Sequence, residues 1–131
     1  MTAEARAREV VEGMLARDRF SAWLGLEVVA IEAGACTCRM TVREEMVNGF
    51  GVSHGGIVFS LADSAFAFAC NSYNFNTVAQ GCAIEFLRPS HEGDVLTARA
   101  TERSLAGRTG VYDIEVTNQR GEKIALFRGK S

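Results

Sequence analysis

Residues 55–72, GGIVFSLADSAFAFACNS, form the most apolar stretch of the chain and constrain how the remainder folds. The stretch is too long for one ordinary strand, and its alanine and leucine content favours a helix. At 1.5 Å per residue, about 18 residues would span roughly 27 Å, the width of a small domain. The sequence therefore predicts a long central helix.

The polar side chains of this helix fall on one stripe. Ser60, Asp63 and Ser64 are spaced by three and four residues, which places them on a common face. The other faces are apolar, with Ile57, Val58, Leu61, Phe66, Phe68 and Ala69. A helix that is apolar nearly all round is buried. Asp63 is then a carboxylate in an apolar element, with no basic residue within two helical turns.

Burial of such an unpaired carboxylate costs several kcal/mol, which something else must offset. One interpretation is structural: Asp63 bonds backbone groups or a neighbouring subunit. The other is chemical: Asp63 acts as a general base or a nucleophile whose surroundings tune its protonation.

The residues His54-Gly55-Gly56 stand where this helix would begin. The first backbone N–H groups of a helix have no internal acceptors, and the positive end of the helix dipole lies there. Two glycines let a ligand approach that backbone closely, although they also suit a plain loop. A carbonyl oxygen placed there would meet donors suited to developing negative charge, as in an oxyanion hole.

The rest of the chain alternates turns with short strand patterns. Residues 3–18 predict an amphipathic helix within an N-terminal segment 1–20, and residues 24–31 and 35–43 predict a hairpin around Ala33-Gly34. An irregular loop is expected at 44–54. Four more strands are expected at 77–87, 94–103, 109–118 and 122–129. The order predicts one α+β domain over 1–131, with an antiparallel sheet wrapped around one helix.

Composition excludes several classes of protein. The chain has 131 residues, 47% hydrophobic and 23% charged, and a net charge of -2, so a general nucleic-acid surface is not expected. Met1 is followed by acidic and basic residues and not by an apolar region, so no secretory signal is expected, and no apolar run approaches the length of a membrane helix. The four cysteines match no zinc or disulfide pattern and are expected to be small buried thiols; they are Cys36, Cys38, Cys70 and Cys82. We expect a soluble cytoplasmic protein.

A resemblance to a known family rests on four stretches: NGFGVSHGGIVFSLADSAFAFACNS at 48–72, IEFLRP at 84–89, TGVYDIEV at 109–116 and ALFRGKS at 125–131. Together they resemble the hotdog-fold acyl-CoA thioesterases, above all the bacterial phenylacetic-acid-degradation (PaaI) thioesterases. The resemblance covers about 85% of the chain; only the first 20 or so residues lack a distinctive match.

The resemblance implies a hotdog fold, a homotetramer built as a dimer of dimers, and active sites at the dimer interface. It implies hydrolysis of acyl-CoA thioesters, aryl-acetyl ones such as phenylacetyl- or hydroxyphenylacetyl-CoA, in phenylacetate catabolism. Asp63 would be the catalytic carboxylate, the Gly55 N–H would polarise the thioester carbonyl, and Asn48 and His54 would orient water, substrate or loop. No metal or redox cofactor is expected, and coenzyme A enters only as part of the substrate.

The candidate substrate-contacting residues are Gly56, Phe59, Ser60, Ser64, Gln80, Arg88, Pro89 and Arg108. Arg88 and Arg108, with Arg103, stand at strand ends or turns where they would meet CoA phosphates; the alternative is that each is a solvated surface arginine. Some relatives carry a hydroxyl donor where this chain has Ala79, so Gln80 is the remaining candidate helper on that strand.

Two other functions fit the same fold. A hydroxyacyl-thioester dehydratase also pairs a histidine with a helix carboxylate, but usually has proline around the histidine, and the loop at 44–54 has none. A non-catalytic acyl-CoA-binding module is the other alternative. It would not need Asp63 or Gly55-Gly56, and regulators of this kind carry an added DNA-binding segment, for which the 131 residues leave little room.

Overall fold

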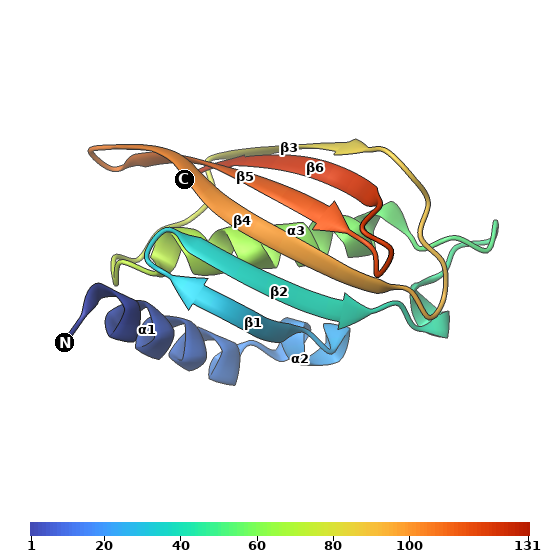
Figure 1. Cartoon of the computed structure of the whole chain (residues 1–131), viewed down its shortest axis with the longest axis horizontal. Helices are drawn as coiled ribbons and strands as arrows, with labels where there is room; N and C mark the ends of the chain where they lie inside the picture. Colours follow the sequence, from blue (N-terminus) through green and yellow to red (C-terminus); the bar gives the residue numbers. More distant parts are fainter.

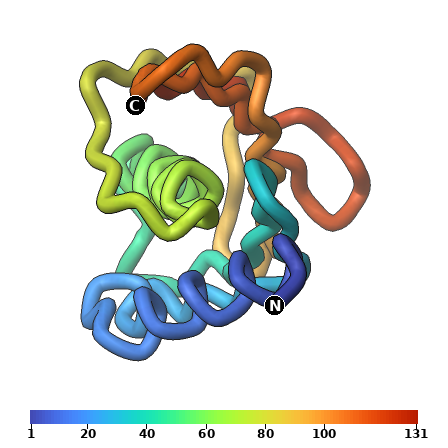
Figure 2. Tube along the Cα trace, turned by 90° about the vertical axis from the view of Figure 1, so that its left-hand side faces the viewer, coloured from blue at the N-terminus to red at the C-terminus, as the bar shows by residue number.

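A computed structural model describes all 131 residues and places the predicted helix at the centre of the molecule. Helix α3 (Gly55–Asn71) begins at the predicted residue and ends one residue early. Its Leu61, Ala62 and Ala65 are fully buried. Figure 2 shows α3 end-on, inside the curve of the sheet, with α1 (Ala3–Arg17) below it. In this view the segment that follows α3 passes to the left of the helix.

Six strands form a single antiparallel sheet in the order β1-β2-β4-β5-β6-β3 (Figure 1). Their bounds are β1 Glu27–Glu32, β2 Ala35–Thr41, β3 Gly81–Phe86, β4 Val95–Ala106, β5 Thr109–Thr117 and β6 Lys123–Lys130. Strands β2, β4, β5 and β6 all pack on α3. The predicted hairpin of β1 with β2 and the predicted α+β class are therefore confirmed. Strands β1 and β3 form the two edges, and β3 hydrogen-bonds only to β6.

The chain between α1 and β1 differs from the prediction. A second helix, α2 (Arg19–Leu24), occupies residues assigned in part to the first strand, so that strand begins at Glu27 and not at Leu24. Asp18 separates the helices: it ends α1, and its carboxylate accepts the Ser21 N–H at 2.9 Å, which caps α2. Gly25 then ends α2 with a φ of 71°, which favours glycine.

Three further predictions need correction. Residues 77–80 are irregular, and β3 begins only at Gly81. The predicted loop at 44–54 contains a 3-10 turn, η1 (Glu44–Met46). Cys82 is exposed because β3 is an edge strand, whereas the other three cysteines are buried as predicted. None of the helices is long and apolar enough to cross a membrane.

Gly129 on β6 allows the sheet to approach the Phe66 ring of α3. A Cβ at this position would lie 2.7 Å from two carbons of that buried ring. We therefore expect Gly129→Ala to lower the free energy of unfolding by about 1–3 kcal/mol, because the packed core cannot make room without strain. Urea denaturation measures this. As a control, Gly13→Ala in α1 meets no atom within 4 Å, and is expected to stabilise the protein by about 0.4–1 kcal/mol. Equal stability of Gly129→Ala and wild type would contradict this account of the packing.

Candidate active site

The loop before α3 is closed on itself by Asn48. Its side-chain oxygen accepts the N–H groups of Phe50 and Val52 at 2.9 and 3.3 Å, and its own backbone N–H donates to the Val52 carbonyl at 2.8 Å. Val47 and Ser53 form an isolated antiparallel bridge at the base of the loop. Of the roles predicted for Asn48, the structure shows contacts that order the loop, and the loop delivers the chain to His54.

His54 caps the N-terminus of α3, and Gly55 is the first residue of the helix. The His54 Nδ1 accepts the Gly56 N–H at 3.3 Å. The Gly55 N–H has no acceptor within the chain, so this donor is free at the positive end of the helix. A Cβ on Gly55 would lie 3.2 Å from Cζ of Phe86 on β3. The glycine therefore keeps a free amide close to an aromatic ring.

A cavity of about 320 Å³ opens beside this amide. It is lined by Ser53, Gly55, Val58, Phe86, Leu87, Arg88, Pro89, Ser90 and Ile124. Of the residues predicted from sequence, the cavity brings together Gly55, Arg88 and Pro89. The Arg88 side chain is exposed and lies 3.9 Å from Glu122, a pairing that is weak at such a surface position.

Asp63 lies about two turns further along α3, on a stripe of small and polar residues that the chain itself leaves partly open. The stripe comprises Gly56, Ser60, Asp63, Ser64, Ala67 and Asn71. The Asp63 carboxylate has no ion-pair or hydrogen-bond partner in the chain. Burial raises its pKa. The pKa of the Cys82 thiol on β3 is raised by partial desolvation and, in addition, by the charge of Asp63, so the carboxylate lies within electrostatic reach of β3.

The other predicted residues of α3 have identifiable contacts. The hydroxyl of Ser60 donates to the Gly56 carbonyl at 2.7 Å, and that of Ser64 donates to the Ser60 carbonyl at 2.8 Å. Both hydroxyl hydrogens are thus used within the helix, which leaves the oxygens available only as acceptors. Phe59 packs edge-on against Phe127 with ring centroids 5.2 Å apart.

Two predicted residues lie neither in the Gly55 cavity nor on α3 or the loop before it. The side-chain amide of Gln80 donates to the Ser131 carbonyl at 2.7 Å, which ties the irregular segment before β3 to the C-terminus. Arg108 lies in the β4–β5 turn, at the opposite end of the domain from the loop that precedes α3 (Figure 1). Arg103, also considered for phosphates, is paired with Asp113 at 3.0 Å. No cluster of three or more His, Cys, Asp or Glu side chains is placed to hold a metal ion.

The sequence did not reveal that Phe86 faces Gly55 or that Ser53 contacts Ser90. The two serines are buried and their hydroxyl oxygens are 2.7 Å apart, although 37 residues separate them in the chain. Phe86 lies within the IEFLRP run at 84–89 already noted and Ser90 follows it, but only the folded sheet places that run beside the start of α3.

Fold and sequence place this chain in one family. The family model of the thioesterase superfamily matches residues 50–125, so the chain belongs to that superfamily. Its fold is the hotdog fold. It is therefore an enzyme of the thioester hydrolase class.

Particular relatives sharpen the assignment. The acyl-coenzyme A thioesterase PaaI of Escherichia coli (strain K12) is 46% identical over 126 residues, covering 96% of this chain and 90% of the relative. The solved structure of the E. coli PaaI protein from the phenylacetic acid degradation operon is 44% identical with a TM-score of 0.97, covering 98% of this chain and 94% of that one. The structure of smu.793 from Streptococcus mutans UA159 bound to acetyl CoA is 27% identical with a TM-score of 0.78, covering 80% and 85%.

Proposed function

We propose that this protein hydrolyses acyl-CoA thioesters to the free acid and CoA, with aryl-acetyl groups such as phenylacetyl or hydroxyphenylacetyl as substrates, in phenylacetate catabolism. The observation that carries the proposal is the pairing, on one helix, of a free N-terminal amide at Gly55 with an unpaired, half-buried carboxylate at Asp63. The name and operon of the E. coli relative support the substrate class, and the acetyl CoA in the S. mutans structure supports CoA recognition. The four free cysteines fit a reducing compartment, the cytoplasm.

The chemistry follows from these two groups. The thioester carbonyl oxygen accepts the Gly55 N–H, and the helix dipole stabilises the negative charge that develops on that oxygen. Asp63 takes a proton from a water molecule as the water oxygen bonds to the carbonyl carbon. The carbon–sulfur bond then breaks and CoA leaves as the thiolate. If Asp63 attacks the carbon itself, an anhydride forms first and water cleaves it. In a single turnover in oxygen-18 water, label enters Asp63 only by the second route, when water attacks the Asp63 carbonyl carbon of the anhydride; attack at the other carbonyl carbon labels the released acid, as the first route does.

The free edge of the sheet supports a homodimer. Strand β3 has an unpaired edge, and Phe86 and Leu87 at its end are exposed, as are Phe75 and Val78 before it. Exposed edges of this kind are normally covered. We place a second copy there, with the two β3 strands antiparallel, so that the partner covers the open stripe of α3. This arrangement inverts the partner and brings the end of its domain that carries Arg108 towards the Gly55 cavity. Two such dimers form the proposed tetramer. Light scattering measures the mass of the assembly and so tests this proposal.

Thiol release from a panel of aryl and alkyl acyl-CoAs tests the function directly. We expect turnover that is fastest with phenylacetyl-CoA and its ring-hydroxylated analogues. Tight binding without turnover across the whole panel would instead identify a non-catalytic acyl-CoA-binding protein. Formation of an enoyl thioester from a 3-hydroxyacyl-CoA would identify a dehydratase.

The raised pKa of Asp63 predicts a pH dependence. Only the ionised carboxylate acts as base or nucleophile, so kcat/KM is expected to rise about tenfold per pH unit below the folded-state pKa and to level off above it. The midpoint should lie above the ordinary aspartate value of about 3.9. Because the folded-state pKa exceeds the unfolded value, ionisation of Asp63 lowers stability as pH rises through this range. Rates measured between about pH 3.5 and 8 test this, and a flat profile contradicts it.

A further inference from the structure

Two segments far apart in sequence meet at the cavity through a pair of buried serines. The Ser53 N–H donates to the Ser90 carbonyl at 2.7 Å, and the two hydroxyl oxygens share a second hydrogen bond of 2.7 Å. Ser53 is 7% exposed and Ser90 is 2% exposed. We call these two hydrogen bonds the serine brace. Ser53 stands two residues before Gly55, so the brace holds the chain just ahead of the free amide.

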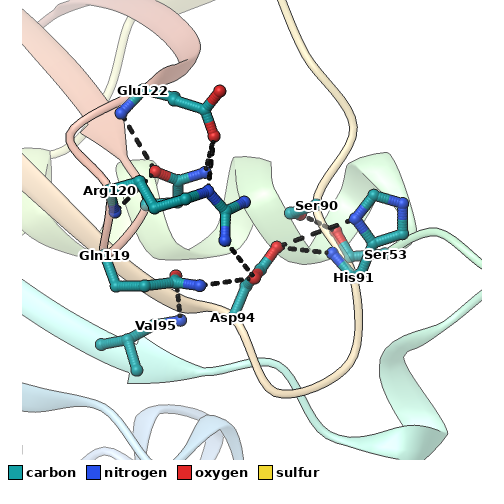
Figure 3. Close-up of polar contacts among 9 residues, drawn as sticks. Ser53, Ser90, His91, Asp94, Val95, Gln119, Arg120 and Glu122 are labelled. Carbon is teal, nitrogen blue, oxygen red and sulfur yellow. Dashed lines mark hydrogen bonds and ion pairs between the residues drawn. The ribbon is translucent and has the colours of Figure 1, made fainter.

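The Ser90 side of the brace is anchored by the buried carboxylate of Asp94 (Figure 3). Asp94 accepts the His91 N–H at 2.9 Å and the Gln119 side-chain N–H at 2.8 Å, and Arg120 lies 4.0 Å away. Gln119 in turn accepts the Val95 N–H at 3.0 Å. These contacts tie the connection between β3 and β4 to the turn between β5 and β6. Ser90 therefore belongs to a part of the molecule fixed from several sides.

The Ser53 side has fewer hydrogen bonds to the rest of the molecule. Within residues 47–54, the other hydrogen bonds are local: they lie inside the loop, lead back to Glu44 or Met46, or lead on into α3. The serine brace is the only hydrogen-bonded link from this loop to the cavity wall formed by residues 86–90. Without it, the start of α3 would be held near the Phe86 ring only by the packing of the helix on the sheet and by the contact of Gly55 with that ring.

We propose that Ser53 and Ser90 are positioning residues for the reaction: the serine brace sets the place of the Gly55 amide relative to the wall of the cavity. This inference rests on the proposed function. An oxyanion donor acts only if it lies at hydrogen-bond distance from the oxygen in the transition state, and small displacements cost large factors in rate. In this role the two serines contact no reacting atom and act only by fixing the backbone that carries the Gly55 N–H.

Steady-state kinetics with phenylacetyl-CoA tests the activity side of this inference. Ser53→Ala and Ser90→Ala are each expected to lower kcat by roughly tenfold with little change in KM, because the carbonyl is bound but poorly polarised. Ser53→Thr keeps the hydroxyl at the edge of the cavity and is expected to restore most of the rate. Ser72→Ala is the matched control: Ser72 is equally buried and donates to the Ala69 carbonyl at 2.6 Å, but lies at the other end of α3. It is expected to lower stability without lowering kcat.

Amide hydrogen exchange provides a readout that does not depend on turnover. The His54 N–H bonds to the Met46 carbonyl and the Ile57 N–H to the His54 carbonyl, so both report on the start of α3. We expect these two amides to exchange faster in Ser53→Ala and Ser90→Ala, measured against Ser72→Ala at matched stability. Unchanged exchange, or kcat within twofold of wild type in both variants, would overturn the role of the two serine hydroxyls in positioning, because both variants keep the backbone hydrogen bond of the brace. A wild type without any thioesterase activity would overturn the proposed function, and exchange would still decide on the brace.

Discussion

Replacing Asp63 with Asn is expected to slow CoA release from phenylacetyl-CoA by at least about 100-fold, the lower range for removal of a general base. The amide keeps the shape of the side chain but can neither take up the proton of an attacking water nor form an anhydride. Because the carboxylate has no ion-pair or hydrogen-bond partner in the chain, its loss removes no contact that stabilises the fold. Thiol release measures the rate.

Stability measured on the same variant separates chemistry from folding. Burial raises the pKa of Asp63, so the ionised group destabilises the folded chain at neutral pH, and the neutral amide relieves this cost. Asp63→Asn is therefore expected to unfold at a urea concentration equal to or above that of wild type. A variant that hydrolyses substrate as fast as wild type would remove Asp63 from the mechanism. A variant that is slow only because it unfolds would show that Asp63 has a structural role.

Gly55→Pro is expected to lower kcat by about 10²–10³ relative to Gly55→Ala, the range for loss of one oxyanion-hole donor. Proline lacks the N–H, and at the first position of a helix it is otherwise favoured. The Gly55 N–H bonds to no acceptor in the chain, so no backbone hydrogen bond is lost. His54 has a φ of -63° and a ψ of 136°, an extended conformation that a following proline accepts.

Gly55→Ala is the matched control for this substitution. Both variants add a Cβ, which would lie 3.2 Å from the Phe86 ring, but only alanine keeps the N–H. The Phe86 ring must shift by a few tenths of an ångström in both variants, so this cost is common to them. The difference in kcat between the two variants therefore reports the loss of the donor together with the proline ring carbon that takes the place of its hydrogen. Equal rates for proline and alanine would show that the oxyanion is held by another group.

The central helix was predictable because several independent signals agree on it. A long apolar run, a start marked by His54-Gly55 and a stripe of polar residues gave its bounds within one residue. Segments with competing signals were harder. Leu24 looks like the start of a strand, but the Asp18 cap and Gly25 close a short helix there. Residues 77–80 have strand-forming composition, yet the Asn71 side chain holds Thr77 by two hydrogen bonds, which keeps the segment irregular.

The candidate site was predictable where its residues lie on one helix and not where it depends on contacts between distant segments. Gly55 and Asp63 share one helix, so their spacing along the chain fixes how far apart they lie along its axis. The contact of Phe86 with Gly55 and that of Ser53 with Ser90 depend on how β3 and the segment after it pass the start of α3, for which no local pattern exists. Gln80 shows the converse: its amide bonds to the C-terminus, a contact that composition could not indicate.

The central claim is tested most directly by a structure of the assembled oligomer with a non-hydrolysable phenylacetyl-CoA analogue. In this analogue a methylene group replaces the thioester sulfur. The account predicts the carbonyl oxygen at hydrogen-bond distance, about 3 Å, from the Gly55 nitrogen. It also predicts the Asp63 carboxylate, directly or through one water, facing the carbonyl carbon. A ligand bound elsewhere, or an Asp63 carboxylate that points away from the ligand-accessible cavity, would contradict it.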